Sequence, residues 1–347
     1  MVVREIYEKL LKANRPKDFF GEIESIQDLH DIYKNTSKLI HPDVVSNEDS
    51  YYASEAFIVL HRLYVRGLNE YDNGLYDVKS SSEEYKKSLP IFQINYGEKR
   101  YEFFKKICVG EVAEIYEGIC DKQPVCIKIP ISTEDSELIS REYEILSRIH
   151  HQSLPYVEDK FSINNATCFT MRKVEGISAT ELMKEYPLGV PSEHVLWMLE
   201  RLLSVVGFLH IHRIVHGNIK PENLIVTKQN HNVTLMGFSF AIPNADRKSA
   251  RYQIVNDFFT ADEVSKKARV EPSSDIFSVG KIGIYLLGGN VEDNSMPVTI
   301  DSRICNFISK MVEKDKSERA YDAWKLYKEL QTLRTSIYGP KRFITLD

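Results

Sequence analysis

The chain has 347 residues, of which 43% are hydrophobic, and a formal net charge of −5 at pH 7. This composition suits two or three folded domains and excludes wholesale disorder. The acidic balance disfavours nucleic acid or an anionic membrane as a partner, so we expect neither. Five scattered cysteines predict reduced thiols in a cytoplasmic protein and no metal site. No signal sequence and no apolar run of membrane-spanning length stands out.

Residues 1 to about 72 have the apolar spacing of helices. A short opening helix is expected around Leu10. A second helix is predicted over 26–40, where apolar residues recur at spacings of three, four and seven. A third is predicted from about Tyr51 to Asn69, with one apolar side. Between the last two lies His-Pro-Asp at 41–43, whose proline cannot continue a helix.

Two amphipathic helices joined by a His-Pro-Asp loop resemble a J-domain, and the resemblance covers roughly residues 1–72. It implies docking on a DnaK-type chaperone ATPase and stimulation of its ATP hydrolysis. The residues implied in that contact are His41, Pro42, Asp43, Lys34 and Lys38. The preceding helix also carries Asp28 and Asp31, which weaken electrostatic steering toward an acidic partner. Two alternatives stay open: a simple helix stop, or a J-like fold that recruits no chaperone.

Turn formers and charged residues between 72 and 84 indicate a linker, which we place at 73–89. Its apolar residues Tyr76, Tyr85 and Leu89 are expected to pack on a folded part of the chain. Strand patterns follow at 91–96 and 101–109. The stretch Cys108 to Gly118 has the spacing of a glycine-rich phosphate loop, but only Gly110 remains of its three glycines. Next, Val125-Cys126-Ile127-Lys128 reads as a strand ending in a lysine, and Glu142 lies on a helix predicted over 136–149.

The most informative stretch is His216-Gly217-Asn218-Ile219-Lys220-Pro221-Glu222-Asn223. It has the His, Lys and Asn of the kinase catalytic-loop signature, but Asn218 stands where that signature has its base aspartate. Further on, Gly237-Phe238-Ser239 has the place of the Asp-Phe-Gly segment, with glycine at the metal-binding aspartate. Residues 90 to about 335 therefore resemble the eukaryotic-type protein kinase family.

The resemblance also implies structural supports that the sequence retains. Asp275 would brace the catalytic loop, Arg319 would pair with Glu263, and Lys128 would pair with Glu142. An apolar stack is expected from Leu146, Phe238 and His216.

Catalytic groups are missing where structural ones persist. A neutral Asn218 cannot act as a general base, and Gly237 offers no oxygen to Mg²⁺. The retained polar residues are Lys128, Glu142, Lys220 and Asn223. The nucleotide pocket would be lined by Gly110, Ile115, Cys126, Lys128, Met171 and Ile225. ATP binding stays open, and Mg²⁺ binding is not expected.

We thus expect an α+β protein with a helical J-domain at 1–72, the linker at 73–89, a small kinase-like lobe at 90–173, a large lobe at 174–338 and a tail at 339–347. The leading interpretation is a catalytically inactive kinase-like scaffold that recruits a DnaK-type ATPase and binds a client or partner protein. The alternative is an atypical ATP-dependent kinase or nucleotide transferase with relocated metal ligands, for which Glu111, Glu114 and Glu222 are the candidates.

Overall fold

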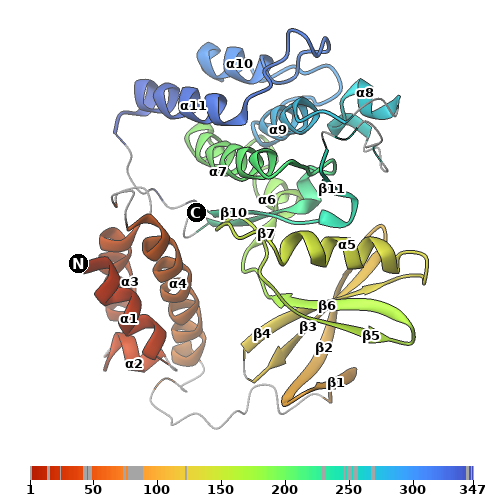
Figure 1. Cartoon of the computed structure of the whole chain (residues 1–347). Helices are drawn as coiled ribbons and strands as arrows, with labels where there is room; N and C mark the ends of the chain where they lie inside the picture. Colours follow the sequence, from red (N-terminus) through yellow and green to blue (C-terminus); the bar gives the residue numbers. More distant parts are fainter. Residues whose placement is uncertain are drawn as a thin grey trace. The chain divides into compact units, whose positions relative to one another are not determined.

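The chain was analysed as a computed structural model (Figure 1). It describes all residues except 1, 14–15, 24, 42–44, 46–48, 73–75, 77–88, 122, 229–231, 246, 248–251, 253–256, 267–269, 341–343, 345 and 347. The chain divides into two compact units. The first holds the N-terminal helices, and the short segments Lys228–Asn230 and Pro340–Asp347 group with it. The second is a mixed helix and sheet unit that holds Ser88–Thr227 and His231–Gly339.

The first unit is helical. Its helices are α1 (Val2–Lys12), α2 (Pro16–Phe20), α3 (Ile26–Ile40) and α4 (Ser50–Asp72). The three helices predicted from apolar spacing are present, and α2 is additional. Helix α3 starts where it does because Ser25 and Asp28 form a capping box, in which each side chain binds the other's backbone N–H.

The core of this unit lies where α1, α2 and α3 pack on α4. Buried apolar side chains from all four helices form it, among them Leu10, Phe20, Leu29, Ile40, Phe57 and Leu60. Tyr33 of α3 stacks on Tyr64 of α4 with ring centroids 4.0 Å apart. Ile26, assigned to the buried face from its spacing, is 39% exposed because it lies in the first turn of α3.

Tyr76 is the described residue that anchors the predicted linker. It is buried, and its hydroxyl donates a hydrogen bond to the Gly21 carbonyl at 3.0 Å. Leu89, also expected to pack on a folded part of the chain, is 94% exposed. Tyr85, the third residue expected to pack, lies outside the described residues.

The small lobe of the second unit is an antiparallel sheet with one long helix. The strands run in the order β1-β2-β3-β4-β6-β5 (Figure 1). Their bounds are β1 (Phe92–Tyr96), β2 (Lys99–Val109), β3 (Ala113–Cys120), β4 (Gln123–Pro130), β5 (Val157–Ile163) and β6 (Ala166–Arg172). Gly118 is required in β3, since a Cβ there would lie 2.1 Å from the Glu102 carbonyl oxygen of β2. The helix, α5 (Ser136–Leu146), ends three residues before its predicted end.

The large lobe is mainly helical. Its helices are α6 (Ala179–Glu185), α7 (Ser192–Ile211), α8 (Asp262–Ser265), α9 (Ser273–Leu286), α10 (Ser302–Ser309) and α11 (Ala323–Tyr338). Short strands and 3-10 turns carry the loops of the site: β7 (Ile177–Ser178), β8 (Ile214–Val215), η1 (Pro221–Asn223), β9 (Leu224–Thr227), β10 (Asn232–Leu235), η3 (Phe238–Phe240), β11 (Ile242–Pro243) and η4 (Asp257–Phe259).

Helix α7 is the core helix of this lobe. It is long and apolar enough to span a membrane, whereas no such run was expected from the sequence. However, 78% of its most apolar stretch is buried within the structure. It contacts α9, α11 and β10, so its apolar character is explained by packing between helices.

Candidate functional site

A buried aspartate holds the backbone of the catalytic-loop stretch by hydrogen bonds. Asp275 of α9 accepts hydrogen bonds from the backbone N–H groups of His216 and Gly217, at 2.8 and 2.9 Å, and from the His210 ring at 3.0 Å. Burial alone would raise the pKa of Asp275, but these donors and the neighbouring histidines outweigh it and lower the pKa. The brace expected from the sequence is therefore present.

His216 is buried and links the loop to the segment that follows β10. Its Nε2 lies 3.0 Å from the Met236 carbonyl oxygen, and its Nδ1 lies 3.2 Å from the backbone N–H of Asn218. The ring meets Phe238 edge-on, with centroids 4.5 Å apart. Burial lowers the pKa of His216. A neutral ring with its proton on Nε2 satisfies both contacts.

Arg319 and Glu263 form the second predicted support. The Arg319 guanidinium binds both carboxylate oxygens, with nitrogen–oxygen distances of 2.5 and 3.3 Å, and the arginine is only 2% exposed. Burial opposes ionisation of Glu263, but the hydrogen bond from Arg319 prevails and lowers its pKa. The pair ties α8 to the loop that precedes α11.

The lysine of β4 forms a buried triad. Lys128 Nζ lies 2.5 Å from Glu142 Oε2 on α5 and 2.8 Å from Ser239 Oγ. Ser239 in turn donates to the same Glu142 oxygen at 2.5 Å. All three residues are buried. The predicted Lys128–Glu142 pair is present, and Ser239, which was not singled out from the sequence, completes it.

The space beside Gly237 is filled by an amide. Gly237 has a left-handed backbone, with φ of +81°, and a Cβ placed on it would lie 2.6 Å from the Asn223 side chain. Asn223 Nδ2 donates to the Asn218 carbonyl oxygen at 2.8 Å. Asn223 therefore stabilises the catalytic loop, and its side chain occupies the space that a side chain at position 237 would need.

These residues do not fit a magnesium ion in the manner of the kinase signature. Mg²⁺ demands near-octahedral oxygen ligands and usually takes one or two carboxylates. Positions 218 and 237 supply an amide and no side chain, and the nearby Glu142 carboxylate is committed to Lys128 and Ser239. Within the described residues, no group of three or more His, Cys, Asp or Glu side chains is arranged to hold a metal.

The predicted nucleotide-pocket residues are only partly brought together. Cys126 and Met171 face each other across β4 and β6 and are buried in one apolar cluster, against which Ile115 packs. Burial, with the nearby Glu117 charge, raises the pKa of Cys126 to about 12. Ile225 lies on β9, half-buried and outside the described members of that cluster.

The loop between β2 and β3 reaches the catalytic loop. The backbone N–H of Gly110 donates to the Ala113 carbonyl at 2.8 Å and closes a tight turn. Glu111, next in the chain, lies 2.5 Å from Lys220 Nζ and 3.3 Å from Asn218 Nδ2. The sequence marked Glu111 as a carboxylate near the site, but its spacing gave no sign of these two partners.

The other two candidate carboxylates have different surroundings. Glu114 accepts from Lys106 at 2.7 Å and from the Tyr116 hydroxyl at 2.6 Å, both on the small-lobe sheet. Glu222 is exposed in η1. Of the three, Glu111 is the one whose carboxylate pairs with Lys220 and Asn218.

Comparison with known proteins decides the family. The family model of the protein kinase domain matches residues 101–330, more than half of the chain. The chain belongs to the protein kinase domain family. The kinase domain found here lies within the range indicated by the sequence motifs.

Individual relatives are distant. Cyclin-dependent kinase-like 1 of Caenorhabditis elegans is 28% identical over 199 residues, which are 55% of this chain and 55% of that protein. CBL-interacting protein kinase 25 of Oryza sativa subsp. japonica is 26% identical over 206 residues, 55% of this chain and 40% of that protein. Serine/threonine-protein kinase pkn2 of Myxococcus xanthus is 23% identical over 274 residues, 69% and 33% respectively. The chain thus covers about half or less of the length of these relatives.

Tyr252, between Gly237 and Glu263 in the sequence, is anchored at the start of α9. Tyr252 is buried, and its hydroxyl lies 2.8 Å from Ser274 Oγ and accepts from the Glu271 backbone N–H at 3.0 Å. Burial raises its pKa. Its position is that of a structural anchor.

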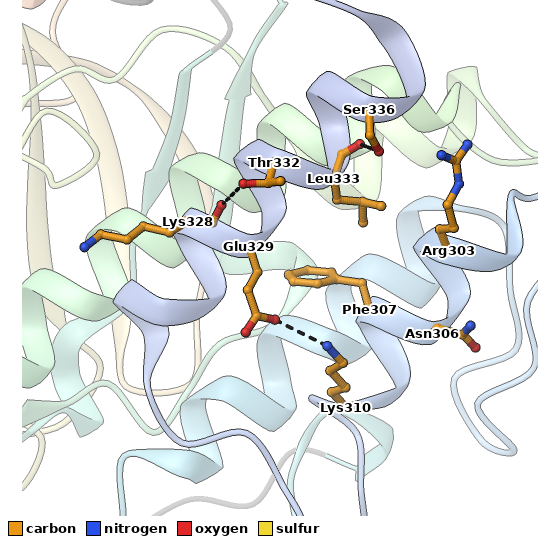
Figure 2. Close-up of a pocket in the computed structure, with 9 residues that line it drawn as sticks. All are labelled: Arg303, Asn306, Phe307, Lys310, Lys328, Glu329, Thr332, Leu333 and Ser336. Atoms are coloured by element: carbon orange, nitrogen blue, oxygen red, sulfur yellow. Dashed lines mark hydrogen bonds and ion pairs between the residues drawn. The ribbon is translucent and has the colours of Figure 1, made fainter.

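A separate pocket of the kinase domain lies between α10 and α11, with a volume of about 670 Å³ (Figure 2). Phe307 and Leu333 form its apolar part, and Lys310 at its edge pairs with Glu329 at 3.3 Å. None of the predicted nucleotide-binding residues lines it.

The residues predicted to bind a chaperone divide into two groups. Lys34 and Lys38 are exposed, one turn apart on α3. His41, the C-cap of α3, is only 2% exposed and meets the Phe57 ring edge-on at 5.1 Å. Pro42 and Asp43 lie outside the described residues. The kinase-domain match starts at residue 101, so the J-domain resemblance stays a prediction.

Proposed function

We propose that the kinase domain of this chain is a scaffold that transfers no phosphate and serves as a platform for a partner protein. The observation that carries the proposal is the contrast between supports and catalytic groups. The braces at Asp275 and Arg319 are complete, whereas Asn218 and Gly237 replace two acidic groups and Asn223 fills the space beside Gly237. Phosphoryl transfer depends mainly on charge and metal positioning, so this combination favours binding over turnover.

A radiolabel assay tests this proposal. The full chain is incubated with labelled ATP and either Mg²⁺ or Mn²⁺, alone and with casein as a general acceptor. The matched control is Lys128→Ala, which removes the ammonium of the triad. We expect equal background incorporation in the two proteins. Incorporation by the wild type that Lys128→Ala abolishes would overturn the proposal.

An atypical transferase is the second candidate, because Glu111 brings a carboxylate to the catalytic loop. Its oxygen lies 3.3 Å from the Asn218 amide, where it could accept a proton from an acceptor hydroxyl. This candidate predicts transfer that is lost in both Lys128→Ala and Glu111→Gln but kept in Glu114→Gln, since Glu114 faces Lys106 instead. The same radiolabel assay therefore separates the two candidates.

We propose that the helical unit recruits a DnaK-type ATPase through the C-terminal end of α3. Support comes from the exposed Lys34 and Lys38, which precede the His-Pro-Asp sequence, and from Leu39 beside them, 57% exposed. These side chains present positive charge around an apolar residue, a combination suited to an acidic protein surface. Because His41 packs on Phe57, its part here is to hold the end of α3.

A chaperone ATPase assay tests this recruitment. We expect the full chain to stimulate hydrolysis, and the Lys34→Glu/Lys38→Glu double variant to abolish stimulation. Lys9→Glu, an exposed lysine of α1, is the matched control and should retain it. His41→Gln should reduce stimulation by loosening the end of α3. If the wild type, the Lys34→Glu/Lys38→Glu variant and His41→Gln stimulated hydrolysis equally, or if none did, the recruitment proposal would be wrong. The helical unit would then be a J-like fold without a chaperone partner.

A further inference from the structure

The contact of Glu111 with the catalytic loop joins the two lobes of the kinase domain. Glu111 belongs to the turn between β2 and β3 in the small lobe, whereas Asn218 and Lys220 lie between β8 and η1 in the large lobe. Each carboxylate oxygen has its own donor: Oε1 is 2.5 Å from Lys220 Nζ and Oε2 is 3.3 Å from Asn218 Nδ2. More than a hundred residues separate the partners, so local structure does not impose the contact.

The donors that hold Glu111 are of the kind that binds an oxyanion. A lysine ammonium and an amide N–H converge on one point, and charge-assisted hydrogen bonds of this type bind carboxylates and phosphates alike. The turn that carries Glu111 is the one that covers nucleotide phosphates in kinases with the full glycine-rich loop. In this chain the carboxylate of Glu111 supplies the negative charge at that point.

We propose that Glu111 is an internal latch that occupies an oxyanion-binding position between the lobes and competes with phosphate-bearing ligands. An anion entering the position must displace the carboxylate from Lys220 and Asn218. It must also approach a like charge, which repels it. Because the carboxylate is attached to the protein, its effective concentration at Lys220 is high and independent of dilution.

The latch is of a kind that can open. The side chain of Glu111 is 37% exposed and that of Lys220 18%, so water reaches and screens the pair. Competition from a carboxylate held in such a partly exposed pair weakens the binding of a ligand but does not prevent it. Removing the carboxylate therefore ought to raise the affinity for a multivalent oxyanion by about tenfold, the effect of one lost repulsion and one lost competitor.

Pyrophosphate binding to the full chain tests the latch. Affinity is measured by titration calorimetry at constant ionic strength for the wild type, Glu111→Ala and Glu111→Gln. We expect Glu111→Ala to bind about tenfold tighter than the wild type, and Glu111→Gln to be intermediate, since glutamine can still accept from Lys220. Glu114→Ala is the matched control, because Glu114 lies close by, near the start of β3, but pairs with Lys106, and it should bind as the wild type does.

A second substitution locates the gained site. In the Glu111→Ala background, Lys220→Met should return pyrophosphate affinity to the wild-type level or below. Metal-free ATP in a parallel titration distinguishes an anion position, which binds both ligands equally, from a nucleotide site, which prefers ATP. Either outcome of the ATP titration supports the latch. An affinity unchanged by Glu111→Ala, or a gain that survives Lys220→Met, would overturn it.

The latch and the proposed function fail in different experiments. The latch concerns binding, and its loss leaves the radiolabel result as it was. Phosphate transfer by the wild type would overturn the scaffold without altering the titrations of Glu111→Ala. Thermal unfolding of each variant, followed by circular dichroism, checks that the substitutions leave the fold intact.

Discussion

Gly237 is one of the two residues at which this kinase domain lacks an aspartate of the family signature. Its left-handed backbone disfavours any residue with a Cβ, and that atom would lie 2.6 Å from the Asn223 amide. We expect Gly237→Ala to lower the free energy of unfolding by about 1–2 kcal/mol. Displacing Asn223 would add to this, because its 2.8 Å hydrogen bond to the Asn218 carbonyl would be lost.

Thermal unfolding measures this cost, with Gly110→Ala as the control. Gly110 does not have a left-handed backbone, and its Cβ would make only an ordinary contact at 3.4 Å. We expect the control to stay within about 0.5 kcal/mol of the wild type. If the two alanine variants were equally stable, the close fit of Asn223 against Gly237 would be wrong.

Sequence reasoning succeeded at residues whose partner is set by motif spacing. Lys128 and Glu142 were paired from their places on a strand and a helix, and the pair is present. Ser239 and the partners of Glu111 were missed, because they depend on how two loops approach each other in space. A serine at the glycine position of the metal-binding segment was the one available sign, since its hydroxyl can reach a buried charge.

At the scale of elements, periodicity was informative only where an element was long enough to show it. Helices α3 and α4 span 15 and 23 residues, and both were predicted from repeated apolar spacing. Helix α2 spans 5 residues, little more than one turn, so no repeat is visible in its sequence. The end of α5 was placed too late because its C-terminal turn carries no glycine or proline.

The link between α8 and the loop before α11 depends on one buried ion pair. Arg319 is 2% exposed and binds Glu263 through two nitrogen atoms, while its guanidinium also lies 4.9 Å from the Phe277 ring centroid. Removing one member of such a pair leaves the other charge buried without compensation. We expect Arg319→Ala to lower the free energy of unfolding by about 3–5 kcal/mol.

Chemical denaturation gives this quantity, and Lys316→Ala is the control. Lys316 pairs with Glu271 at 2.8 Å, but its side chain is 52% exposed, so its loss should cost less than about 1 kcal/mol. Arg319→Lys should fall between the two, since an ammonium cannot bind both carboxylate oxygens in a planar fork. A cost for Arg319→Ala no larger than that for Lys316→Ala would contradict the structural role of the pair.

At the scale of the whole molecule, each unit has its own core and a histidine whose pKa is lowered by burial. In the helical unit, burial lowers the pKa of His61 to about 4, and its ring lies 3.2 Å from the Tyr33 hydroxyl. In the kinase unit, burial and the charge of Arg201 lower the pKa of His151 to about 4. Both rings therefore stay neutral in the folded protein at a pH where they gain a proton in the unfolded chain.

Acid should therefore destabilise both units, through different residues. The ordinary pKa of histidine is about 6.5, so as pH falls from there toward 4 the unfolded state binds protons that the folded state does not, and stability falls. For His61 we expect a loss of about 2 kcal/mol between pH 7 and 5. The loss for His151 should be smaller, since its side chain is only partly buried.

The two tryptophans allow the units to be followed separately. Trp197 and Trp324 both lie in the kinase unit, so tryptophan fluorescence reports that unit alone, while circular dichroism reports both. We expect His61→Gln to reduce the acid sensitivity seen by circular dichroism and leave the fluorescence transition unchanged. His151→Gln should flatten the pH dependence of the fluorescence transition, and the exposed His150→Gln should change neither. If His61→Gln were as acid-sensitive as the wild type, the buried ring of α4 would not be the group through which the helical unit senses pH.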